Sequence, residues 1–136
     1  MGAWSGEPFG NDTAADWAWE LDAQDDWQVV HDALNDAVTS TEYIDAEVAT
    51  DAIAAAEVVA QGLGRATQDD GYTESVALFV ARASKPTEKI VELAVAALAA
   101  ASGPNSELTD LWAESDGAEW SEANTRLKEA LDSSHL

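Results

Sequence analysis

The chain contains 136 residues, of which 46% are hydrophobic, and its 27 acidic and 6 basic residues give a formal net charge of −21 at pH 7. This length allows a buried core, whereas this charge repels phosphate backbones and anionic membrane surfaces. Cysteine is absent, which excludes disulfides, thiolate metal sites and cysteine nucleophiles. We therefore expect one domain over residues 1–136 that binds neither nucleic acid nor membranes.

The first ten residues contain three glycines and a proline, which predicts an arm rather than a helix. Two aromatic side chains in this arm, Trp4 and Phe9, are expected to anchor it to the rest of the protein. The arm does not show the basic segment and apolar segment of a secretory signal, so we expect a cytoplasmic protein.

A first helix is predicted from the capping residues at 11–13 to about residue 23. Its apolar stripe includes Trp17 and Leu21, whereas Trp19 lies off that stripe and is expected to contact the arm. A second helix follows at about 25–38. Its apolar side chains recur at helical spacing and predict its buried face: Trp27, Val30, His31, Leu34, Ala37 and Val38.

The longest apolar segment, residues 46–63, is predicted to form the central helix. Alanine, valine and isoleucine cover most of its circumference. The remaining polar arc is narrow and contains Glu47, Thr50, Asp51, Glu57 and Gln61. Small alanine side chains let neighbouring helices approach closely. We predict that Asp45 caps this helix and that Gly62 and Gly64 end it.

Residues 64–72 have the composition of a loop, and four more helices are predicted after it, at about 73–83, 86–101, 105–112 and 116–131. Pro86 is placed in the first turn of the second of these, where proline is tolerated. The tail 132–136 is expected to fray. No segment alternates as a strand does. The predicted fold is therefore all-α: a bundle of six or seven helices around residues 46–63, with the arm 1–10 packed on it.

The opening MGAWSGEPFGNDTAADW resembles the start of domain-of-unknown-function family 4259, whose bacterial members typically begin Met-Gly-Ala-Trp, followed by a glycine-rich turn, Phe, Asn-Asp and a helix. The matching residues are Gly2, Ala3, Trp4, Phe9, Asn11, Asp12, Ala14, Asp16 and Trp17. Weaker similarity occurs at 54–64 and 106–112, whereas Ser5 and Glu7 replace the glycines usual in the turn. The resemblance implies a bacterial protein and no particular activity, because the family has no assigned function.

Metal binding is not indicated by the sequence. His31 is the only internal histidine, and a zinc site needs several His or Cys ligands at close spacing. Acidic residues four apart, such as Asp12 and Asp16, are expected to face solvent together. The same spacing relates Asp32 to Asp36 and Glu47 to Asp51, and none of these pairs has the spacing of a calcium loop. We expect neither a metal nor a cofactor.

Glu57 is the most unusual acidic residue, because apolar residues flank it on both sides. Helical geometry places it at the border of the polar arc. If it is buried instead, its pKa is raised and a functional role is worth considering. Its candidate basic partners are then Arg65, Arg82 and Lys89.

Three functions are compatible with these features. The favoured one is a protein-binding module, in its most specific form an inhibitor or immunity-type partner of a basic protein such as a nuclease. The residues proposed for binding are Trp4, Phe9, Asp12, Asp16, Trp19, His31 and Glu57. One alternative is a small-molecule-binding or hydrolytic enzyme that uses Glu57 or His31, and another is a structural protein without a recognisable site. An apolar surface ringed by acids favours a protein partner.

Overall fold

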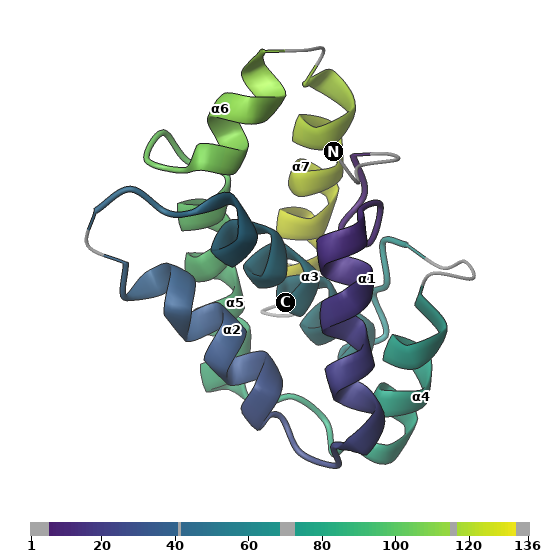
Figure 1. Ribbon diagram of the computed structural model, residues 1–136. Helices are drawn as coiled ribbons and strands as arrows, with labels where there is room; N and C mark the ends of the chain where they lie inside the picture. Colours follow the sequence, from purple (N-terminus) through teal and green to yellow (C-terminus); the bar gives the residue numbers. More distant parts are fainter. Residues whose placement is uncertain (1–5, 41, 69–72, 115–116, 133–136) are drawn as a thin grey trace.

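The computed structural model describes residues 6–40, 42–68, 73–114 and 117–132. These residues form a compact all-α bundle, as predicted (Figure 1). The elements are α1 (Asp12–Ala18), the 3-10 helix η1 (Trp19–Ala23), α2 (Gln28–Val38), α3 (Ala46–Gly62), α4 (Glu74–Arg82), α5 (Glu88–Ala101), α6 (Glu107–Ala113) and α7 (Ala118–Asp132). None of these helices is long and apolar enough to span a membrane.

Helix α3 is the centre of the bundle, which confirms the prediction for 46–63. Figure 1 shows it crossing the middle of the molecule, and it packs against α1, α2, α4, α5, α6 and α7. Every residue from 52 to 60 is buried, including five alanines with no exposed surface: Ala52, Ala54, Ala55, Ala56 and Ala60. Alanine has little bulk, so neighbours can approach the helix backbone from several sides.

Of the two predicted ends of α3, the glycine stop at the C-terminal end is confirmed and the Asp45 cap at the N-terminal end is wrong. At its C-terminal end Gly64 has a φ of 78°, and the N–H of Arg65 donates to the Ala60 carbonyl at 2.9 Å. This is the glycine stop that the sequence predicts. At the other end Asp45 occupies the N-cap position, but its side chain makes no capping bond. The carboxylate of Glu107 accepts from the N–H of Ala46 instead, at 2.8 Å, so α6 provides the cap.

The described part of the N-terminal arm packs on the bundle. Phe9 is fully buried, and its N–H donates to the Gln68 side-chain oxygen at 2.8 Å. The N–H of Gly6 donates to the Glu119 carboxylate at 2.6 Å. A Cβ atom at position 6 would lie 2.5 Å from the backbone nitrogen of Trp120, so only glycine fits this approach. The other predicted anchor, Trp4, lies outside the described residues.

Three details of the predicted helices are wrong. Trp19 is 71% exposed, because the arm packs on α7 and on the loop after α3 instead of covering it. The His31 side chain is 50% exposed and Val38 is 40% exposed, although both were predicted on the buried face of α2. The buried residues of α2 are Val30, Ala33, Leu34 and Ala37. Pro86 precedes α5, because Thr87 is the N-cap and its hydroxyl accepts from the N–H of Ile90 at 3.3 Å.

Candidate functional site

A cleft between η1, α2 and α3 is lined by acidic and apolar side chains. Its volume is about 390 Å³. Six acidic residues line it, together with apolar residues from the same elements and from α1. The lining residues are Trp17, Glu20, Val29, Asp32, Ala33, Asp36, Asp45, Glu47, Val48 and Asp51. We call this surface the acidic cleft.

The helical spacing of the acids explains how they meet. Asp32 and Asp36 are four residues apart on α2, and Glu47 and Asp51 are four residues apart on α3, so each pair lies on one helix face. Helices α2 and α3 pack closely against one another, and both pairs line the acidic cleft. No basic side chain is among the residues that line it, so the negative charges are not compensated locally within the described structure.

Asp51 is the most deeply placed of these acids. Its Oδ1 atom is buried and has no hydrogen-bond partner in the described structure. Burial, followed by the charges of Glu47, Glu20 and Asp36, raises the pKa of Asp51 from 3.8 to about 7. A cation that entered the acidic cleft would relieve the repulsion and supply the missing donor. The carboxylates are nonetheless spread over the walls, and no group of three or more in the described structure could hold a metal ion.

The raised pKa of Asp51 predicts a pH-dependent stability. Between pH 3.8 and about 7 the folded protein keeps a proton that the unfolded chain has released. The free energy of unfolding is therefore expected to fall as the pH rises through this window. Asp51→Asn should flatten that decline in urea unfolding, whereas Asp16→Asn on the exposed face of α1 should keep it. Equal pH profiles for wild type and Asp51→Asn would contradict the assignment.

Glu57 forms a second, fully buried polar cluster on α3. Its carboxylate accepts from the Thr67 N–H at 2.9 Å, the Thr67 hydroxyl at 2.5 Å, the Gln68 N–H at 3.1 Å and the Gln61 amide at 3.2 Å. Burial raises the pKa of Glu57, and these donors oppose the rise. The loop after α3 thus folds back over the carboxylate and is held by it.

This arrangement corrects the prediction that Glu57 lies at the border of the polar arc, because no part of its surface is exposed. It also replaces the basic partners proposed from the sequence. Arg65 is exposed, and Arg82 bonds to the chain after α1. The donors to Glu57 are the N–H and hydroxyl of Thr67, the N–H of Gln68 and the side-chain amide of Gln61, which residue types alone do not reveal.

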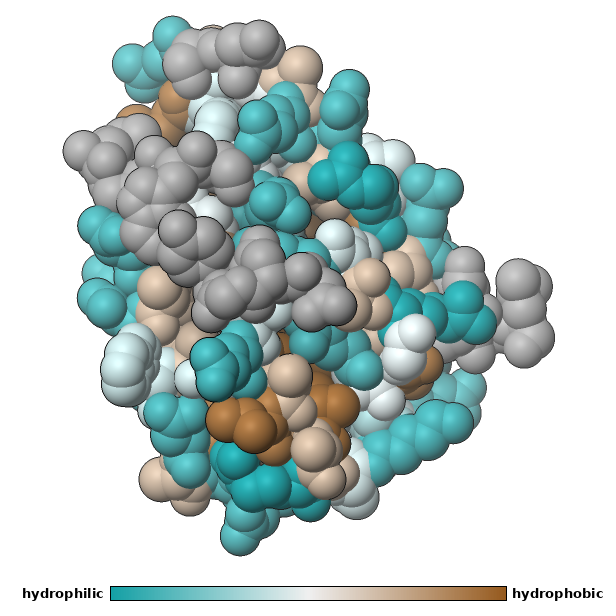
Figure 2. Space-filling view, turned by 90° about the vertical axis from the view of Figure 1, so that its right-hand side faces the viewer, coloured by the Kyte–Doolittle hydropathy of each residue, from teal (hydrophilic) through white to brown (hydrophobic). Residues whose placement is uncertain are grey.

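A third feature is the groove between α1, η1 and α4, with a volume of about 530 Å³. The exposed side chains of Trp19 and Leu78 contribute to it, together with Ala15, Ala18, Asp22, Glu74, Ser75 and Arg82. Figure 2 shows apolar residues gathered low on the face that carries α4. We call this surface the Trp19–Leu78 groove.

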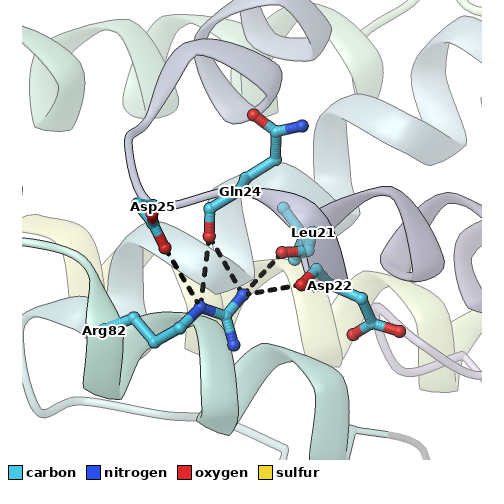
Figure 3. Close-up of polar contacts among 5 residues, drawn as sticks. All are labelled: Leu21, Asp22, Gln24, Asp25 and Arg82. Atoms are coloured by element: carbon cyan, nitrogen blue, oxygen red, sulfur yellow. Dashed lines mark hydrogen bonds and ion pairs between the residues drawn. The ribbon is translucent and has the colours of Figure 1, made fainter.

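Arg82 joins α4 to the end of η1 beside this groove. Its guanidinium donates to the carbonyls of Leu21 and Gln24 at 2.7 and 3.0 Å, and it lies 3.6 Å from the Asp25 carboxylate (Figure 3). Carbonyls at a helix end lack partners within the helix. Arg82 therefore caps the C-terminal end of η1, and this structural role explains its position beside the groove.

The residues proposed for binding do not converge on one site. Phe9 and Glu57 are buried, whereas Asp12, Asp16 and His31 are exposed and Trp19 lines the Trp19–Leu78 groove. None of those that the structure describes lines the acidic cleft, and Trp4 lies outside the described residues. The sequence does show the pairs Asp32–Asp36 and Glu47–Asp51, and all four residues line the cleft. The sequence alone could not show that packing of α2 on α3 places both pairs around the same hollow.

A family model described as Domain of unknown function (DUF4259) matches residues 2–123. The chain belongs to the DUF4259 family. The family that the N-terminal resemblance indicated is thereby confirmed, with a match over most of the chain. Neither the curated proteins nor the solved structures gave a match for this DUF4259 protein. The acidic cleft, contributed by residues 17–51, lies entirely within the matched range.

Proposed function

We propose that this DUF4259 protein is a protein-binding module whose acidic cleft receives basic side chains of a partner. In its most specific form the partner is a basic protein, such as a nuclease, that the module inhibits or neutralises. The observation that carries the proposal is the acidic cleft itself. Six acidic side chains line one hollow together with apolar residues that include Trp17, Val29 and Val48, and no basic residue is among the lining residues that the structure describes.

The chemistry of the acidic cleft suits a lysine or arginine side chain. Such side chains have an apolar stem and a charged end, and the stem can pack on the apolar residues that line the cleft. The charged end can donate to the carboxylates and, as Asp51 releases its proton, to Asp51 Oδ1, which has no donor among the described residues. The net charge of −21 adds long-range attraction, which speeds the encounter with a basic protein.

The test compares two sets of four substitutions, each of which replaces four acidic side chains by their amides. The cleft set is Asp32→Asn, Asp36→Asn, Glu47→Gln and Asp51→Asn. The control set, on exposed positions of α5, of α7 and at the C-cap of α6, is Glu88→Gln, Glu92→Gln, Glu114→Gln and Glu122→Gln. We expect the cleft set to weaken binding of a lysine-rich peptide about 10-fold or more at low salt, and the control set to weaken it about 3-fold or less.

The measurement is isothermal titration calorimetry at two salt concentrations, with circular dichroism to verify that both sets remain folded. Binding of the wild type should weaken as salt rises, because salt screens the attraction. Equal losses in the two sets would show that total charge rather than the acidic cleft determines binding. That result would overturn the proposed function.

A further inference from the structure

A groove between α5 and α7 differs chemically from the acidic cleft. Its volume is about 320 Å³, and its walls include Val95, Leu98 and Ala99 on α5 and Trp120, Asn124 and Lys128 on α7. We call it the α5–α7 groove. Although the chain carries a net charge of −21, the described residues that line the groove include no carboxylate, and Lys128 is the only charged one. A neutral or anionic ligand therefore meets no local repulsion there.

Asn124 is the exceptional side chain of this groove. It is 8% exposed, and both its Oδ1 and Nδ2 atoms are buried without a hydrogen-bond partner in the described structure. It lies four residues after Trp120 and three before Leu127, on the buried face of α7. An apolar residue would suit this position, since a buried amide without partners is costly. The Asn124 amide has one acceptor atom and two N–H donors, and none of the described residues forms a hydrogen bond with them.

Other polar groups of the groove are already engaged. The Ser102 hydroxyl donates to the Leu98 carbonyl at 2.6 Å, and the Thr125 hydroxyl donates to the Ser121 carbonyl at 3.0 Å. Both bonds stay within one helix, where such hydroxyls commonly bond back to the preceding turn. Among the buried polar atoms of the described lining residues, those of Asn124 are left without a partner.

We propose that the α5–α7 groove binds an amide through Asn124, with an adjacent apolar group packed against Leu98 and Val95. The carboxamide of asparagine presents an acceptor and a donor side by side. The complementary ligand has an N–H and a C=O side by side, as one residue of an extended peptide or a small primary carboxamide does. Both sources share this chemistry. The inference does not depend on the acidic cleft, because the two surfaces share no lining residue.

The experiment follows the backbone and side-chain amides of the full chain by ¹⁵N NMR. One probe is N-acetyl-leucine methylamide, which represents a peptide main chain, and the other is isovaleramide, a small primary carboxamide. Methyl isovalerate keeps the carbonyl and the apolar group but has no N–H. For ligands of this size we expect a Kd on the order of 1–10 mM. The Asn124 side-chain resonances should shift with saturation for at least one amide.

Asn124→Leu is the informative variant, because leucine suits the buried face of α7 and the protein should stay folded. It should weaken amide binding about 10-fold or more, since the bidentate bonds are lost, whereas Asn105→Leu at an exposed position should not. Saturation by the methylamide alone indicates a peptide ligand, and saturation by isovaleramide alone indicates a small molecule. No saturation up to about 100 mM of either amide, ten times the weakest expected Kd, would overturn the inference. So would equal binding of the ester, or wild-type affinity in Asn124→Leu.

Discussion

Glu57→Ala is expected to lower the free energy of unfolding by about 3–5 kcal/mol. The carboxylate accepts bonds from Thr67, Gln68 and Gln61, and alanine removes the acceptor of the Thr67 N–H and of the buried Gln68 N–H. The substitution should also destabilise the packing of the arm, because the Gln68 side chain accepts from the N–H of Phe9. Urea unfolding gives the free energy, and hydrogen exchange should show lost protection at Phe9, Thr67 and Gln68.

Two comparisons separate this effect from the removal of one charge. Glu57→Gln keeps an acceptor oxygen in place and should cost about 1–2 kcal/mol. Glu92→Ala removes an exposed carboxylate from α5 and should stay within about 0.5 kcal/mol of wild type. If Glu57→Ala were as mild as Glu92→Ala, the carboxylate would not be what holds the loop after α3.

Ala56→Leu should lower the free energy of unfolding by about 2–3 kcal/mol, because α3 has no room for larger side chains. Ala56 has no exposed surface, and α3 is surrounded by six other helices. Extra methyl groups must therefore displace a neighbouring helix or adopt a strained rotamer. The measurement is the urea midpoint together with the slope of the transition, which verifies that unfolding remains two-state.

Ala96→Leu is the matched control for this substitution. Ala96 also lies within an alanine-rich helix, α5, but it is exposed. Leucine and alanine have similar helix propensities, so the control should change stability by about 0.5 kcal/mol or less. Similar losses at positions 56 and 96 would mean that helix propensity, rather than close packing around α3, determines the effect.

The architecture could be predicted because the residues of α3 by themselves indicate a central, buried helix. Apolar residues on nearly its whole circumference require neighbours on several sides, and Gly64 provides a stop whose geometry is local. The errors occur where contacts with segments distant in the sequence determine whether a side chain is buried. Trp19 and His31 follow patterns that predict contact, but whether a side chain at the edge of a stripe is covered depends on how the arm and helices pack.

The candidate sites were less predictable for the same reason. A helical wheel places Glu57 beside polar neighbours, and it cannot show that residues 67 and 68 return to cover the carboxylate. The acids of the acidic cleft were visible as pairs on separate helices. Their convergence depends on the packing of α2 on α3 and on the position of Glu20 in η1. Charge counts favour a basic partner, and the packing brings together the acids that we propose to bind it.

The most direct test of the acidic cleft is to map a lysine-rich peptide onto the protein by ¹⁵N NMR at low salt. We predict that the largest shifts cluster on η1, α2 and the first half of α3, including Glu20, Asp36 and Asp51, and that they disappear in the cleft set of substitutions. Shifts of similar size on the acidic faces of α5, α6 and α7 would contradict a defined binding site.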